Sequence, residues 1–124
     1  MIVVFEKRSR WTPELQRRFL SEPIPVRGCH SASDVPALAV AAGVACVVLC
    51  LDDAEGECLQ VLGRLAIRRS RVAVVALGGD RAGGLEWPFR ELGATEFLAG
   101  TYTAADVARV CRRHVEQAGA HSST

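Results

Sequence analysis

The chain has 124 residues, which is the size of one domain. Its 15 basic and 14 acidic residues give a formal net charge of +1, which excludes a strong field for nucleic acid. No apolar run approaches the roughly 18 residues of a membrane-spanning helix, and residues 1–7 lack the pattern of a signal peptide. We therefore expect a cytoplasmic protein with no nucleic-acid partner and no membrane contact.

The cysteines and histidines do not form a recognisable site. The sequence has five cysteines, an odd number, and none of them forms a Cys-x-x-Cys pair. An odd count argues against a disulfide framework, and buried cysteine usually acts as a small apolar side chain. The three histidines are scattered without metal-ligand spacing. We expect no metal ion and no cofactor.

The first third of the chain predicts two strands and two helices. Residues 2–5 are wholly apolar and predict a strand. Thr12, followed by proline and glutamate, predicts the start of a helix. Residues 26–29 form a weaker strand, and its Gly28 favours an edge position. A small-residue helix over 35–42 follows, with Ser33-Asp34 as its cap and Gly43 as its end.

The middle of the chain contains the most apolar segment. Residues 44–51 are apolar on both alternating sides, which predicts a strand covered by helices on both faces of a parallel sheet. This strand stops at Asp52 and Asp53. A helix over 56–69 and a second buried strand over 72–77 follow.

The last third begins with a glycine-rich segment, 78–84, which predicts a flexible loop. Residues 88–92 predict a short helix at best, because Trp87 precedes a proline. A short strand follows over 95–98. Thr103 then caps the final helix, over about 104–117.

Five strands alternating with five helices predict the fold class. Crossovers of this length force parallel, right-handed connections. We expect an α/β protein with a flavodoxin-like, doubly wound, five-stranded sheet of order 2-1-3-4-5, in three layers. The domain should span 1–118, with a disordered tail over 119–124.

One stretch resembles a known family. Residues 93–102 read Gly-Ala-Thr-Glu-Phe-Leu-Ala-Gly-Thr-Tyr. This is similar to the fifth strand and loop of CheY-like response regulator receiver domains, which read Gly-Ala-Asp-Asp-Tyr-Leu, any residue, Lys-Pro-Phe. The final helix then starts at the expected distance, and the element order agrees over almost the whole chain. The resemblance implies a role in two-component or phosphorelay signalling.

The resemblance also implies a phosphorylation pocket, which this sequence does not preserve. The family uses two acids for magnesium, an aspartate that accepts the phosphoryl group, a Ser/Thr and a lysine. Those positions fall here on Glu6, Lys7, Cys50, Leu77 (or Gly78, one residue later) and Gly100. Magnesium needs oxygen ligands and a phosphoryl group needs positive charge. We therefore expect a degenerate pseudo-receiver without magnesium-dependent aspartyl phosphorylation, and not an enzyme.

The sequence leaves two other hypotheses for a functional site open. Asp52 or Asp53 could join Glu6 in a rearranged acidic pocket, although both aspartates could simply end a strand near a helix start. Cys50 could be a reactive thiol of a redox sensor or enzyme, because a nearby cation such as Lys7 lowers a thiol pKa. A buried, inert Cys50 is the alternative.

Without phosphorylation, the expected function is protein–protein interaction. The resemblance implies a protein partner or a homodimer through the surface of the fourth helix, fifth strand and fifth helix. On this surface the sequence offers Trp87, Phe97, Tyr102, Arg109, Arg112 and Arg113. Aromatic residues with arginine neighbours are typical interface anchors. We expect Trp87 and Tyr102 to be exposed, and Phe97 to lie in the core.

Overall fold

The structure is a computed structural model that describes residues 1–41, 43–52, 54–68 and 71–122. Asp53 lies outside these ranges. The structure therefore does not describe the contribution of Asp53 to the acidic-pocket hypothesis. Within the described ranges, no helix combines the length and the apolar character needed to cross a membrane.

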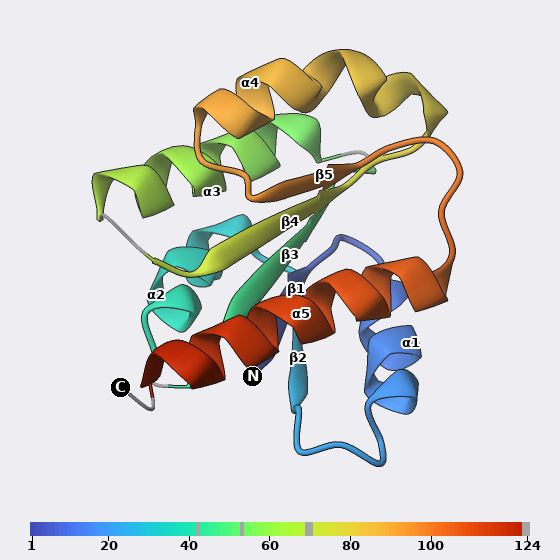
Figure 1. The fold of residues 1–124 in the computed structure, drawn as a ribbon. Helices are drawn as coiled ribbons and strands as arrows, with labels where there is room; N and C mark the ends of the chain where they lie inside the picture. The colour runs from blue at the N-terminus through green and yellow to red at the C-terminus, as the bar shows by residue number, and fades with distance from the viewer. Residues whose placement is uncertain (42, 53, 69–70, 123–124) are drawn as a thin grey trace.

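The core of the protein is one parallel sheet (Figure 1). Its strand order is β2-β1-β3-β4-β5, and every neighbouring pair is parallel. The strands are β1 (Ile2–Phe5), β2 (Val26–Cys29), β3 (Cys46–Cys50), β4 (Ala73–Leu77) and β5 (Glu96–Leu98). The expected flavodoxin-like α/β fold, with strand order 2-1-3-4-5, is confirmed.

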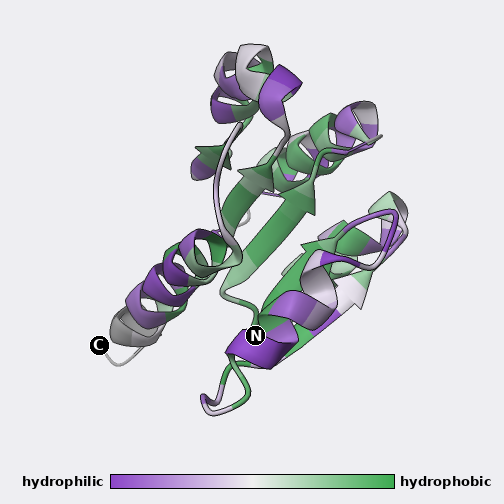
Figure 2. Cartoon of the chain, turned by 90° about the vertical axis from the view of Figure 1, so that its right-hand side faces the viewer, coloured by the Kyte–Doolittle hydropathy of each residue, from purple (hydrophilic) through white to green (hydrophobic). Residues whose placement is uncertain are grey.

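Helices cover both faces of this sheet, so the molecule has three layers. The helices are α1 (Trp11–Arg18), α2 (Val35–Ala39), α3 (Glu55–Ile67), α4 (Glu86–Glu91) and α5 (Ala104–Ser122). Helices α1 and α5 lie on one face, and α2, α3 and α4 lie on the other (Figure 1). Figure 2 shows the result, a green apolar sheet between helices whose outer sides are purple.

Side-chain alternation along the strands creates two apolar cores. In β1, Val3 and Phe5 pack with α2, α3 and α4, whereas Ile2 and Val4 pack with α1 and α5. Successive strand residues point to opposite faces, so a strand in the middle of a three-layer fold must be apolar throughout. All five residues of β3 are buried accordingly.

The weak second strand lies at the edge of the sheet, as expected. Position 28 requires glycine because a neighbouring side chain leaves no room for a Cβ atom, in addition to its place in an edge strand. A Cβ atom at Gly28 would lie 2.8 Å from Oγ1 of Thr12, so a larger residue would collide with the start of α1.

Several helix boundaries differ from the sequence prediction. Thr12 is not the cap of α1, which begins one residue earlier, at Trp11. Helix α2 ends at Ala39, and a short 3-10 helix over Ala32–Asp34 precedes it in place of a side-chain cap. Helix α5 continues to Ser122, beyond the expected end at residue 117.

The segment 78–84 was expected to be a flexible loop, and this prediction is wrong for most of its length. A 3-10 helix over Asp80–Leu85 leads directly into α4, which includes Trp87. Ala82 is buried in the core beside α4, so packing outweighs the local preference of glycine for loops. Pro88 is tolerated because it lies in the first turn of α4, where its missing N–H has no intrahelical partner.

Candidate functional site

A pocket lies at the carboxyl ends of β1 and β3. Because the strands are parallel, their carboxyl ends lie along the same edge of the sheet, where ligands of doubly wound folds usually bind. The pocket has a volume of about 470 Å³. Its lining residues are Glu6, Lys7, Arg8, Arg10, Trp11, Cys50 and Asp52. Three residues predicted from the sequence to belong to a degenerate phosphorylation pocket, Glu6, Lys7 and Cys50, therefore line one pocket.

Glu6 is the buried acid of this pocket, and it caps helix α1. Its side chain is 3% exposed. Oε1 accepts hydrogen bonds from the N–H groups of Arg10 (3.1 Å) and Trp11 (2.9 Å). Oε2 accepts from the N–H of Thr12 (2.8 Å) and from its hydroxyl (2.7 Å). A carboxylate has about four lone-pair sites, so Glu6 has none left for a metal ion.

Lys7 points to a neighbouring helix. Its ammonium group forms an ion pair with Glu57 of α3, and both side chains are partly exposed. The loop that carries Lys7 is fixed from β2, because His30 Nδ1 lies 2.8 Å from the carbonyl oxygen of Glu6. This loop therefore has a defined geometry.

Cys50, the residue predicted to take the place of the family's phosphoryl acceptor, ends β3, and its surroundings make it a weak nucleophile. Burial raises the pKa of the Cys50 thiol far above its ordinary value, the carboxylates of Glu6 and Asp52 raise it further, and Arg10 opposes them only in part. The expectation that Lys7 lowers this pKa is wrong, because Lys7 pairs with Glu57. The thiolate, which is the reactive form, is strongly disfavoured.

The two candidate positions for the family's hydroxyl end β4. Leu77 is buried in the core with α1 and α5, and pairs with Cys50 in the sheet. Gly78 follows, and a Cβ atom there would lie 2.3 Å from Cβ of Ala82. Neither residue offers a hydroxyl, and Gly78 has no room for one while the 3-10 helix stays in place.

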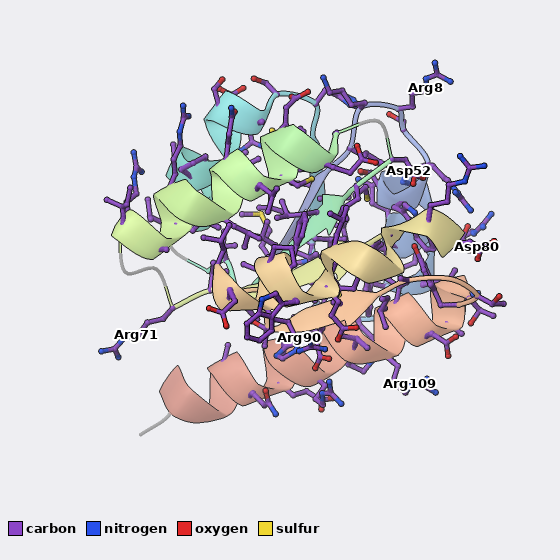
Figure 3. The ribbon with its side chains drawn as sticks, turned by 90° about the horizontal axis from the view of Figure 1, so that it is seen from above. Arg8, Asp52, Arg71, Asp80, Arg90 and Arg109 are labelled. Atoms are coloured by element: carbon purple, nitrogen blue, oxygen red, sulfur yellow. The ribbon has the colours of Figure 1, made fainter. Side chains whose placement is uncertain are left out.

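Gly100, the residue predicted to take the place of the family's lysine, lies in the loop after β5. Its φ of +83° lies in the left-handed region that disfavours other residues. A Cβ atom there would lie 3.7 Å from Oδ1 of Asp80, which Figure 3 shows at the same end of the molecule as Asp52. No cation enters the pocket from this loop.

The acidic-pocket hypothesis keeps only Asp52 among the described residues. Asp52 is exposed and lines the pocket, while Glu6 beneath it is fully hydrogen-bonded. Within residues 1–41, 43–52, 54–68 and 71–122, no three His, Cys, Asp or Glu side chains form a group that could hold a metal ion.

An aromatic wall closes the pocket on the side of α5. The ring of Trp11 stacks on Tyr102 with centroids 5.9 Å apart, and the Arg10 guanidinium lies 5.3 Å from the Trp11 centroid. The Tyr102 hydroxyl donates to the carbonyl oxygen of Gly78 at 3.0 Å. Tyr102 is therefore half-buried, contrary to the expectation that it is exposed.

Sequence reasoning missed Arg8, Arg10 and Trp11 as pocket residues. The signal was present, because three cations occur within four residues immediately after β1. Only the structure shows that Arg10 is stacked on Trp11 at the edge of the pocket.

The proposed interaction residues are dispersed. Trp87 is 72% exposed on α4, whereas Phe97 is buried against Phe89. On α5, Arg109 pairs with Asp106 and Arg113 with Glu96. Arg112 instead makes two hydrogen bonds, of 2.9 and 2.8 Å, to Glu22 near α1. Arg112 therefore lies on the side of α5 next to Glu22, apart from the other two arginines.

The fold matches solved receiver domains, although no protein-family model and no curated protein matches the sequence. The signal receiver domain of a Luxo repressor protein from Vibrio parahaemolyticus is 16% identical, with a TM-score of 0.80, over 98% of this chain and 93% of its own. The receiver domain of the response regulator TorR is 17% identical, with a TM-score of 0.77, over 94% and 96%. Full-length FixJ from B. japonicum is 18% identical, with a TM-score of 0.78, over 98% of this chain and 60% of its own. The chain therefore has the fold of response regulator receiver domains.

Proposed function

We propose that this chain is a pseudo-receiver, a signalling domain of a two-component or phosphorelay-type system that acts by protein–protein interaction without being phosphorylated. The observation that carries the proposal is the state of the pocket. A buried, protonated thiol, Cys50, ends β3 where a receiver has its aspartate. The single acid retained after β1, Glu6, uses both oxygens to cap α1.

The side chains that hydrogen-bond and neutralise the phosphoryl group in a receiver, a hydroxyl and a lysine, are also absent from the corresponding positions. Leu77 and Gly78 cannot donate a hydroxyl hydrogen bond to a phosphoryl group, and Gly100 cannot neutralise it. Phosphoryl transfer depends on charge stabilisation and positioning. A pocket without all of these groups should therefore not catalyse phosphoryl transfer at all, and not merely catalyse it more slowly.

The redox alternative is disfavoured by the same geometry. Cys50 has no ion pair with Lys7, and burial keeps its thiol protonated. The remaining function is recognition, for which α4 offers the best anchor. Trp87 is largely exposed, and the Glu86–Arg90 ion pair lies on the same short helix. Arg109 and Arg113 add exposed charge on α5.

Intact mass after incubation with acetyl phosphate and Mg²⁺ tests the loss of phosphorylation. We expect no phosphoryl adduct and no beryllofluoride binding. The TorR receiver domain, treated in parallel, is the positive control. An adduct on the purified chain would overturn the proposal.

Sedimentation at increasing protein concentration tests a homodimer on the α4–β5–α5 surface. Trp87→Ala should weaken self-association about tenfold or more, as expected for an aromatic anchor. Leu20→Ala is the matched control, because Leu20 is 81% exposed but lies after α1. A monomer at every concentration would reject the homodimer and leave a different protein as the partner.

A further inference from the structure

The charge of the pocket is opposite to what a receiver requires at the same place. The family carries metal-binding acids after β1, whereas here Lys7, Arg8 and Arg10 line the pocket. The two carboxylates of the lining are Glu6 and Asp52. Whether the pocket attracts a cation or an anion depends on which of these charges are already compensated.

Two of the five charges are compensated inside the protein. Glu6 accepts four hydrogen bonds at the start of α1, three of them from backbone N–H groups, so its charge is satisfied. Lys7 has Glu57 as its partner. In the part of the chain that the structure describes, neither Arg8 nor Arg10 forms an ion pair with a carboxylate. The uncompensated charges are therefore two guanidinium groups and the carboxylate of Asp52.

Arg10 is positioned to donate hydrogen bonds. Its guanidinium lies over the Trp11 ring, and Trp11 is itself held by stacking on Tyr102. A guanidinium held over an aromatic ring is partly fixed in place, so less side-chain entropy is lost when it pairs with an oxyanion. The loop beneath Arg10 is fixed through Glu6 and His30.

Arg8 and Asp52 lie at the same end of the molecule (Figure 3). Both residues line the pocket; in Figure 3, Arg8 extends outward from the molecule and Asp52 lies further in. This arrangement gives the pocket one oriented cation, one cation at its rim and one opposing carboxylate. The volume of about 470 Å³ is in the range of small-molecule sites.

We propose that this pocket binds a small oxyanion, a phosphate or a carboxylate, non-covalently and without a divalent cation, with Arg10 as the main ligand and Arg8 at the rim. The inference goes beyond the proposed protein-interaction function and does not depend on it. Asp52 weakens this binding by repulsion and so sets the affinity.

Calorimetric titration in the presence of EDTA tests the site, with inorganic phosphate and succinate as separate probes. We expect saturable binding of at least one probe at millimolar concentration or below. Arg10→Gln should weaken it about tenfold, as expected for a charge-assisted contact. Arg8→Gln should weaken it less, and Asp52→Asn should strengthen it several-fold.

Arg68→Gln is the matched control, because Arg68 is exposed after α3 and does not line the pocket. If Arg10→Gln does not fold, Arg8→Gln and Asp52→Asn carry the test, since both side chains are exposed. The proposal is overturned by no binding of either probe, by a requirement for Mg²⁺, or by an equal loss in Arg68→Gln. A phosphoryl adduct would defeat the proposed function instead, so the two failures are distinguishable.

Discussion

The loop after β1 and the loop after β5 differ in charge, in how they are held and in their relation to the pocket. The first loop lines the pocket, whereas the second reaches it only through Tyr102, which stacks on the lining residue Trp11. The first loop, residues 6–10, carries three cations and is fixed by hydrogen bonds from α1 and His30. The second, residues 99–103, carries no charge and turns at Gly100 with a positive φ. In the receiver pattern the acids follow β1 and the lysine follows β5. Here the cations follow β1, and the loop after β5 carries none.

Glu6 explains how the first loop is held. Its carboxylate is buried and accepts four hydrogen bonds from the residues at the start of α1. Its role is now structural, because it holds the start of α1 and through it Trp11. The first loop should therefore tolerate substitution poorly at Glu6, while the second loop should resist any side chain at Gly100 because of its positive φ.

The largest effect is expected for Glu6→Gln. An amide keeps the size of the side chain, but its NH₂ group faces backbone N–H donors and leaves buried groups unpaired. We expect the free energy of unfolding, measured by urea denaturation, to fall by about 2 to 4 kcal/mol.

Glu57→Gln is the control for Glu6→Gln. It breaks the partly exposed ion pair with Lys7 and should cost below about 1 kcal/mol. Equal losses in the two variants would mean that Glu6 has no special structural role.

The next largest effect is expected for Gly78→Ser, which returns a hydroxyl to the end of β4. The new Cβ would lie 2.3 Å from Cβ of Ala82, so the 3-10 helix would have to move. We expect a loss of about 1 to 3 kcal/mol in urea denaturation, as for an overpacked core.

Gly84→Ser, in the same 3-10 helix, controls for the loss of a glycine. No atom lies within 4 Å of a Cβ at that position, so this variant should be nearly neutral. A stable Gly78→Ser variant would show that the end of β4 can accept the hydroxyl that receivers have there.

Most of the fold follows from local sequence patterns. The fully apolar β3 requires helices on both faces, and the weak β2 belongs at an edge; both expectations are confirmed. These conclusions depend only on apolar periodicity and turn residues, which act over a few positions. The flexible loop expected over 78–84 is wrong because burial of Ala82 outweighs the local glycine signal.

The site depends on contacts between distant residues, which no local pattern reveals. Thr12 is a plausible helix cap by sequence, but the hydroxyl donates to Glu6, six residues earlier. His30 fixes the same loop from 24 residues away, and Arg112 reaches Glu22 across 90 residues. The cations of the first loop are visible in the sequence, whereas the stacking that orients Arg10 is not.

A smaller effect is expected for Gly100→Lys, which returns the family's cation to the loop after β5. Any residue with a Cβ is strained at a φ of +83°, so we expect a loss of about 1 to 2 kcal/mol in urea denaturation. Gly63→Lys is the matched control, because Gly63 lies inside α3 with open space around it. That variant should be neutral or slightly stabilising, since lysine favours helix over glycine. A change in the free energy of unfolding that has the same sign in both variants would contradict the argument from the positive φ of Gly100.

The smallest effect is expected at Tyr102, which links the loop after β5 to α1 and to the end of β4. It stacks on Trp11 and donates to Gly78, so Tyr102→Phe should lower the free energy of unfolding by about 0.5 to 1.5 kcal/mol at neutral pH. Burial raises the pKa of Tyr102 to about 12, with Asp52 and Cys50 adding and Arg10 opposing. Because an unfolded tyrosine titrates near pH ~10, the unfolded chain releases this proton first, and stability falls as the pH rises from about 10 to 12.

The phenylalanine variant lacks this titration, so the stability advantage of tyrosine should shrink over that pH window. Comparing urea denaturation of the two proteins from neutral pH upward cancels the other titrating groups. The chain has only one tyrosine, so phenolate absorbance reports Tyr102 alone. A phenolate that forms near pH ~10 in the folded protein would mean that Tyr102 is solvated, and that its ring does not hold the loop after β5 against Trp11 and Gly78.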